Sequence, residues 1–126
     1  MQKTLIRIIF PALIFTIAGS AYSQCRTMDK NIEKPLKVSS TSPVIVRDRI
    51  KLCTSHIFHF RATRGQQLKN KLITGKKTAL TVLPPSGEAI VDGGFSWIGK
   101  LTETGKYEIQ IGTDVTANYT MEFTLK

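Results

Sequence analysis

The chain has 126 residues and a mass of 14.0 kDa, which allows one domain and excludes most multi-domain enzymes, solenoids and dinucleotide-binding folds. Hydrophobic residues make up 41% and charged residues 21%, a balance that indicates a folded rather than a disordered chain. The formal net charge is +9, from 18 basic and 9 acidic residues, so an acidic partner is the first expectation.

Residues 1–23 predict a secretory signal peptide. Lys3 and Arg7 give a basic start, and an apolar run follows from Ile8 to Ala18. The small residues Ala21 and Ser23 then fit a signal peptidase site, so we expect cleavage after Ser23. A retained anchor is the alternative, but a span needs about 20 apolar residues and this run is much shorter. We therefore expect a periplasmic or secreted bacterial protein with no stable membrane span.

Removal of the signal leaves a chain whose charge is uneven along the sequence. Residues 24–77 hold 13 basic and 3 acidic residues, net +10, whereas residues 78–126 hold 3 basic and 6 acidic residues, net −3. The sequence therefore predicts a protein with two differently charged halves.

The two cysteines, Cys25 and Cys53, predict a disulfide, because an even number in an exported chain is most simply paired. In the chain-entropy model a disulfide that closes a loop of this length stabilises the fold by roughly 3 to 4 kcal/mol. The bond would tie an extended segment, 24–43, to a domain at 44–126. With no C-x-x-C motif and no suitably placed histidine, neither a redox centre nor a zinc site is expected.

Short alternating apolar runs, separated by turn residues, continue from Val44 to the C terminus. In the last and clearest run, four apolar side chains from Tyr119 to Leu125 alternate with polar ones. No mature segment shows helical periodicity, so the sequence predicts an all-β fold, a single antiparallel β-sandwich that is jelly-roll-like and has about seven or eight short strands. Expected strands lie near 44–46, 57–62, 68–72, 78–83, 89–91, 95–101, 107–111 and 119–125, with turns at 64–66, 84–87, 92–94 and 103–106.

Catalytic signatures are missing from the sequence. There is no G-x-S-x-G, no P-loop and no EF-hand spacing. His56 and His59 are three apart on an expected strand, so they should face opposite sides and cannot share a metal. We therefore expect a non-enzymatic binding protein without a metal or cofactor. Export also argues against a nucleic-acid partner despite the basic charge.

Five pieces of the chain follow one another in a familiar order. They are residues 58–66 (FHFRATRGQ), 83–87 (LPPSG), 97–101 (WIGKL), 104–109 (TGKYEI) and 119–125 (YTMEFTL). This order resembles bacterial pre-peptidase C-terminal domains and the periplasmic inhibitors of i-type and g-type lysozymes. The resemblance implies a jelly-roll-like β-sandwich, and it covers residues 58–126.

The inhibitor resemblance implies a binding loop. In those inhibitors a Ser-Gly-x-Tyr loop enters the lysozyme cleft, and the matching positions here are Thr104, Gly105, Lys106 and Tyr107. Threonine replaces serine, which keeps the hydroxyl and adds a methyl group. The second loop, 112–118, is short and has no arginine, and this departure weakens the match. An ordinary structural role is the alternative, because a buried tyrosine often pins a corner of a β-sandwich. The loop lies in the acidic half, which would favour a basic lysozyme as partner.

The basic half offers a second hypothesis. Its region 47–77 is either an ordinary solvated surface or a site for an anionic envelope polymer or glycan, as in a generic envelope-binding module. The candidate side chains are Arg61, Arg64, Lys69, Lys71, Lys76 and Lys77. Trp97 is expected in the core rather than stacked on a sugar. A protein partner, a lysozyme, is the leading expectation, and the anionic polymer is the alternative.

Overall fold

The computed structural model describes residues 30–39, 41–74 and 77–126. Within these ranges the chain forms strands joined by short loops, and no helix there is long and apolar enough to cross a membrane. The strands are β1 (Lys30–Glu33), β2 (Val44–Ile50), β3 (Thr54–Ala62), β4 (Gln67–Thr74), β5 (Thr78–Leu83), β6 (Val91–Gly94), β7 (Ser96–Lys100), β8 (Gly105–Thr113) and β9 (Ala117–Leu125).

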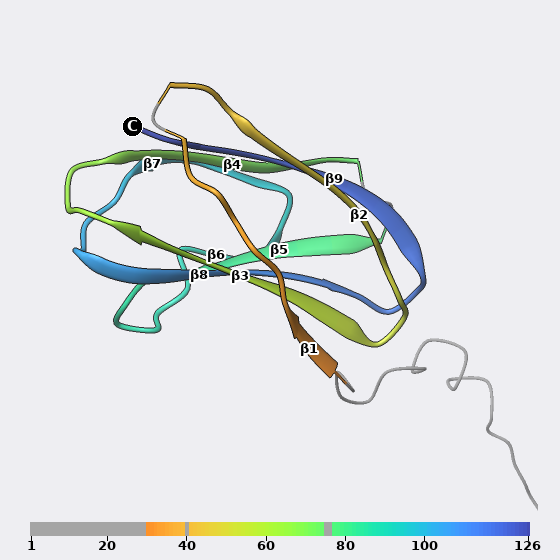
Figure 1. Cartoon of the computed structure of the whole chain (residues 1–126). Helices are drawn as coiled ribbons and strands as arrows, with labels where there is room; N and C mark the ends of the chain where they lie inside the picture. The colour runs from red at the N-terminus through yellow and green to blue at the C-terminus, as the bar shows by residue number, and fades with distance from the viewer. Residues whose placement is uncertain (1–29, 40, 75–76) are drawn as a thin grey trace, which may run out of the picture.

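The strands form two layers that pack face to face (Figure 1). One sheet has the order β1-β3-β8-β5-β6 and the other the order β2-β9-β4-β7. All pairings are antiparallel except that of β1 with β3, which is parallel. The predicted all-β sandwich is therefore confirmed. The additional strand β1 lies in the segment predicted as extended. Its four residues are all exposed and show no alternating pattern from which a strand could have been predicted.

The core lies between the two central strands, β8 and β9. Both strands alternate buried and partly exposed residues along their whole length, as the sequence predicts. Phe60 of β3 joins the two layers, because its ring stacks on Tyr107 at 5.1 Å and meets Phe123 edge-on at 4.9 Å. Such aromatic contacts add to the burial of apolar surface that stabilises the sandwich.

Four local predictions need correction. The strand expected at 89–91 is wrong except for its last residue, because β6 begins only at Val91. Residues 92–94 are not a turn, because they belong to β6; Gly93, with φ +78°, accommodates a β-bulge opposite β5 within the strand. The predicted strand at 95–101 is shorter, and Phe95 lies outside it with 64% of its surface exposed. The expected turn at 103–106 ends earlier, since β8 already begins at Gly105.

Several predictions fall outside the described residues. The signal peptide at 1–23, Cys25 and Lys76 all lie there. The Cys25–Cys53 disulfide and the boundary at 23 therefore stay predictions. The division of the chain at 43 lies within the described residues but is not tested by them, and it also stays a prediction. Cys53 itself is buried in the short connection between β2 and β3.

Candidate functional site

Three loops meet at one end of the sandwich. They join β3 to β4 (63–66), follow β5 (84–87) and join β7 to β8 (101–104), and we call them together the loop end. The first and third are paired through their backbones, because Gly65 N–H donates to Leu101 C=O and Leu101 N–H donates to Gln66 C=O, both at 2.8 Å. The Arg64 amide also donates to the Thr104 hydroxyl oxygen at 2.8 Å.

Tyr107 anchors the 101–104 loop from inside the sandwich. Its side chain is fully buried, and its hydroxyl donates to the Glu103 carbonyl oxygen at 2.7 Å. The Glu103 amide donates back to the same hydroxyl at 3.3 Å. Burial raises the pKa of Tyr107, although the hydrogen bond with Glu103 partly opposes the shift, so the phenol stays neutral. Tyr107 thus holds the loop, and its own ring is not part of the accessible surface.

The carboxylate of Glu103 fixes the neighbouring loop. It accepts hydrogen bonds from the Ser86 amide at 3.0 Å and from the Ser86 hydroxyl at 2.7 Å. The 84–87 loop is itself closed by the Gly87 amide, which donates to the Pro84 carbonyl at 2.8 Å. The side chain of Glu103 therefore links the 101–104 loop to the 84–87 loop. Its backbone links the 101–104 loop to Tyr107 of β8.

Gly105 is required where β8 begins. Its φ of +144° is unfavourable for any side chain, and a Cβ there would lie 2.9 Å from Cγ of Pro85. The backbone of the Thr104–Tyr107 segment thus runs directly against the 84–87 loop.

Two side chains of this segment face solvent, Thr104 and Lys106. Lys106 stands between two hollows of about 280 and 380 Å³, and His59 lines both. Pro85 and Glu108 belong to the first hollow, and Arg61 belongs to the second. The loop end therefore offers an exposed threonine and lysine on a rigid backbone, with recesses on either side.

The charge around the loop end differs from the prediction. The sequence placed the loop in an acidic half, but Arg61 of β3 pairs in register with Lys106, and Arg64 lies against Thr104. Sheet formation thus brings arginines of the basic half beside the loop. The loop end therefore carries Arg61 and Lys106 as well as Glu103 and Glu108, because strands from both halves of the sequence pair with one another.

Solved structures provide a comparison for this geometry. The periplasmic inhibitor of g-type lysozyme from Aeromonas hydrophila, PliG, superposes with a TM-score of 0.68 at 18% identity, over 77% of this chain and 98% of that one. A mutant of the corresponding Escherichia coli inhibitor superposes with a TM-score of 0.58 at 17% identity, over the same shares of the two chains. The Salmonella Typhimurium inhibitor superposes with a TM-score of 0.61 at 14% identity, over 75% of this chain and 98% of that one.

The chain has the fold of these inhibitors. At such low identity the likeness concerns the fold and not the residues of a site. No protein-family model matches the chain, and its sequence matches no curated protein. The predicted resemblance to the lysozyme inhibitors is thus supported in architecture, whereas the resemblance to pre-peptidase C-terminal domains stays a prediction.

The five candidate residues of the basic region that the structure describes do not form one patch. Arg61 lies on the five-stranded sheet, whereas Lys69 and Lys71 lie on the other sheet, each 3.9 Å from the Glu122 carboxylate. Arg64 is at the loop end, and Lys77 directly precedes β5 at the opposite end of the sandwich. Trp97 is partly buried against the core, as predicted, and its ring covers Gly99.

The two histidines face opposite sides of β3, as the sequence predicts. His56 points into the sandwich, where Nδ1 lies 2.8 Å from the Tyr119 hydroxyl. His59 points outward, and its Nε2 lies 2.9 Å from a Glu33 carboxylate oxygen. Among the described residues no group of three or more His, Cys, Asp or Glu side chains is placed to hold a metal ion.

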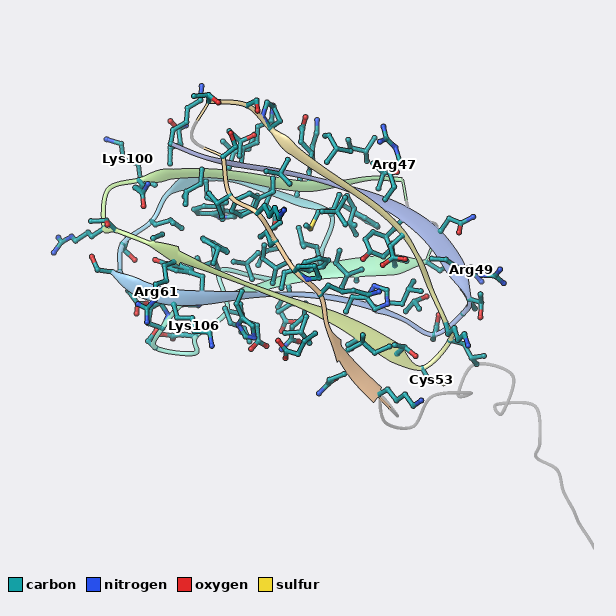
Figure 2. All side chains as sticks on the ribbon, in the orientation of Figure 1. Arg47, Arg49, Cys53, Arg61, Lys100 and Lys106 are labelled. Carbon is teal, nitrogen blue, oxygen red and sulfur yellow. The ribbon has the colours of Figure 1, made fainter. Side chains whose placement is uncertain are left out.

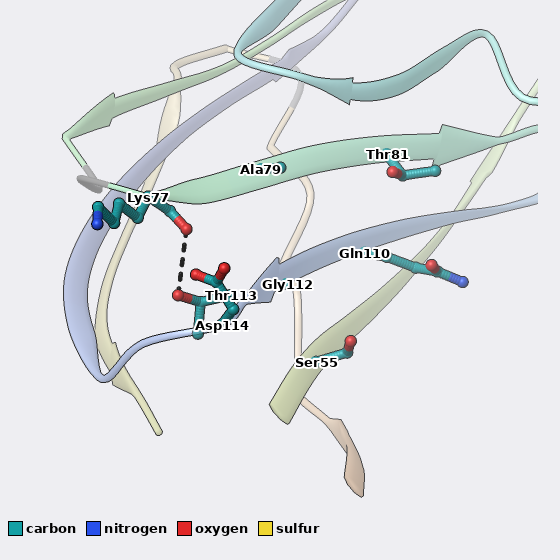
Figure 3. A pocket seen from close by; sticks show the side chains of 8 residues that line it. All are labelled: Ser55, Lys77, Ala79, Thr81, Gln110, Gly112, Thr113 and Asp114. Carbon is teal, nitrogen blue, oxygen red and sulfur yellow. Dashed lines mark hydrogen bonds between the residues drawn. The ribbon is translucent and has the colours of Figure 1, made fainter. Parts of the chain in front are cut away.

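A further hollow of about 430 Å³ lies on the outer face of the five-stranded sheet (Figure 3). It exists because small residues meet there in register, Ser55 beside Gly112 and Gly112 beside Ala79. At its end the Thr113 hydroxyl donates to the Lys77 carbonyl oxygen at 3.2 Å. The hollow could not be predicted from the sequence, since a row of small residues across three strands appears only once the register is known. No histidine lines it, so Ser55 has no imidazole base there.

Proposed function

We propose that the protein is a non-enzymatic periplasmic inhibitor of a lysozyme, and that it acts by placing its loop end in the substrate cleft of the enzyme. One observation carries the proposal. The sandwich matches nearly the whole length, 98%, of three periplasmic inhibitors of g-type lysozyme. A g-type lysozyme is accordingly the first enzyme to test.

The exposed and buried residues of the loop end have different roles in this proposal. Thr104 and Lys106 present their side chains to solvent and would contact the enzyme. Tyr107 and Gly105 would act as positioning residues, because one pins Glu103 and the other permits close approach to Pro85. A rigid loop loses little conformational freedom on binding, which favours affinity.

The test is a cell-wall lysis assay with g-type, i-type and c-type lysozymes and increasing amounts of the protein. Thr104→Arg and Lys106→Glu should each weaken inhibition roughly tenfold or more, which corresponds to a loss of about 1.4 kcal/mol in binding. Thr116→Arg is the matched control. Thr116 is also exposed, but it lies beyond the other end of the nine-residue strand β8, roughly 27 Å away.

Two results would contradict the proposal. Failure of the wild-type protein to inhibit any of the three classes would remove the function itself. Alternatively, Thr116→Arg could abolish inhibition while Thr104→Arg leaves it intact. The function would then hold, but the binding surface would lie at the opposite end of the sandwich. Cell fractionation of the full chain, with the protein recovered in the periplasmic fraction, tests the location separately.

A further inference from the structure

The outer face of the four-stranded sheet collects basic side chains from three strands. Within the strands of this sheet, in the part of the chain that the structure describes, five cationic side chains lie there with one carboxylate, that of Glu122. We call this surface the basic face, and its cations are Arg47 and Arg49 of β2, Lys69 and Lys71 of β4, and Lys100 of β7.

Strand register places these side chains on one side of the sheet. In β2 the arginines alternate with inward residues, and Arg47 is in register with Thr120 of β9. Lys71 is in register with Glu122, and Lys100 is in register with Gln67. Neighbouring strands lie about 4.8 Å apart, so the four strands carry the charges across a width of roughly 15 Å.

Glu122 neutralises only a small part of this charge. Lys69 and Lys71 both approach the same carboxylate oxygen, each at 3.9 Å, and both lysine side chains remain more than 40% exposed. Arg47 and Arg49 are exposed as well. The basic face thus has a surplus of positive charge that is available to a partner.

Apolar side chains lie among these cations. Ile98 is 60% exposed and in register with Lys69, and Ile45 is 39% exposed and in register with Glu122. Ile73 is 50% exposed and lies at a β-bulge in β4, between Leu72 and Thr74, just beyond Lys71. A soluble polyanion would use the cations and leave these isoleucines in water. A lipid bilayer uses both, because phosphates attract the cations and the acyl boundary takes up apolar side chains.

The opposite face of the molecule does not share this charge. On the five-stranded sheet Arg61 and Lys106 are accompanied by the carboxylates of Glu33, Glu108 and Asp92. Figure 2 shows the separation: Arg47 and Lys100 lie on the layer of the four-stranded sheet, and Arg61 and Lys106 lie on the other layer. An anionic surface would therefore attract the protein in one orientation.

We propose that the basic face binds the surface of an anionic phospholipid membrane, with the strands lying along it and Ile45, Ile73 and Ile98 at the acyl boundary. In this orientation the loop end lies at the side of the bound molecule and stays accessible. The inference does not depend on the proposed inhibition of a lysozyme, because it uses a different surface.

Co-sedimentation of the protein with phospholipid vesicles tests the proposal. We expect binding to vesicles that contain phosphatidylglycerol and none to pure phosphatidylcholine. Binding should weaken as the Debye length falls from about 30 Å at 0.01 M salt to about 3 Å at 1 M. Each cation near such a surface contributes roughly fivefold to partitioning, so Arg47→Gln/Arg49→Gln/Lys71→Gln should lower it about 100-fold. Ile98→Ser should lower partitioning with the charge unchanged.

A charge-matched variant controls for net charge. Arg61→Gln/Arg64→Gln/Lys77→Gln removes three cations elsewhere and should keep at least a tenth of the wild-type partitioning. Equal loss in the two triple variants would overturn the proposal, since net charge alone would then explain the binding. It would also be overturned if the protein bound a soluble anionic glycan but no vesicles. Circular dichroism of each variant confirms that it is folded before binding is compared.

Discussion

The Nδ1 atom of His56 lies 2.8 Å from the hydroxyl of Tyr119, and this hydrogen bond joins the two sheets of the sandwich. His56 is 2% exposed and Tyr119 is 1% exposed. Asp48 of β2 lies beside them, with a carboxylate oxygen 3.8 Å from His56 Nδ1 and 3.0 Å from Nζ of Lys34. Four polar groups therefore close the edge of the sandwich where β2 and β3 approach each other.

The protonation states in this cluster follow from its surroundings. Burial lowers the pKa of His56, and the Lys34 charge lowers it further, whereas Asp48 opposes the shift. Burial raises the pKa of Tyr119, and the charge of Asp48 adds to that effect. For Asp48 burial alone would raise the pKa, but hydrogen bonds from Lys34 and the Arg49 amide leave it below the ordinary value. Near neutral pH the cluster thus contains a neutral histidine, a neutral tyrosine and a carboxylate.

Acid should destabilise the protein through His56. Because its pKa in the fold is below the ordinary value of 6.5, the unfolded chain takes up the proton first as the pH falls. The contribution of this group to the free energy of unfolding is therefore complete above pH 6.5 and declines as the pH falls toward the folded pKa. Urea unfolding at a series of pH values between neutral and mildly acidic conditions measures this decline.

His56→Gln should reduce that dependence, because its side chain does not titrate. His59→Gln is the matched control and should retain the decline caused by His56, since His59 lies on the outer face beside Glu33. The prediction concerns pH values above the range where Asp48 takes up its proton, so the two groups can be separated. The same decline in wild type and His56→Gln would contradict it.

Tyr107→Phe should destabilise the protein by about 1 to 2 kcal/mol, because it removes the two hydrogen bonds with Glu103 and keeps the buried ring. The sharper measurement is hydrogen exchange of the Glu103 amide, which should become faster than in wild type. Thr104→Ala serves for comparison, since it removes the acceptor of the Arg64 amide at the same loop. Unchanged exchange at Glu103 in Tyr107→Phe would show that the tyrosine does not hold the loop.

The sequence predicted the sandwich because its strands follow simple alternation. In β9 the buried residues from Tyr119 to Leu125 occupy every second position, and the structure buries them all. β5 has the predicted bounds, Thr78–Leu83, because a turn of two prolines and a glycine ends it. The prediction from alternation was wrong at β6. Gly93 there allows a β-bulge within the strand, whereas the Asp-Gly-Gly sequence is typical of a turn.

The loop end and the basic face were harder to predict, because both depend on register. Alternation along β2 and β4 indicates that Arg47 and Lys71 face outward, but not that β9 lies between these strands. The link between Glu103 and Ser86 joins loops 17 residues apart in the sequence, and the sequence carries no local signal for it. The role of Tyr107 in a corner was predicted as an alternative, because a tyrosine after a glycine is common there.

The predicted Cys25–Cys53 disulfide can be tested directly on the exported protein. Oxidised protein should give no free-thiol signal after denaturation, and Cys25→Ser/Cys53→Ser should lower the free energy of unfolding by roughly 3 to 4 kcal/mol. Cys53 is 5% exposed, so Cys53→Ser alone also buries a hydroxyl, and Cys25→Ser is the cleaner single change. Two free thiols in the exported wild-type protein would refute the pairing.

Gly105→Ala should destabilise the protein more than Gly65→Ala. Both glycines have positive φ, +144° and +98°, so alanine at either position strains the backbone, by about 1 to 3 kcal/mol. Only at Gly105 would the new Cβ also meet an obstacle, Cγ of Pro85 at 2.9 Å, whereas the space around Gly65 is open.

A double variant separates the two costs at Gly105. Pro85→Ala removes the ring carbon that the new Cβ would meet, so Gly105→Ala should cost less in the Pro85→Ala background than in wild type. The strain of the backbone remains in both backgrounds and should resemble the cost of Gly65→Ala. Urea unfolding of the four proteins of this cycle gives the coupling free energy. A coupling of zero would mean that backbone strain alone requires glycine there, and that the 84–87 loop yields to the added side chain.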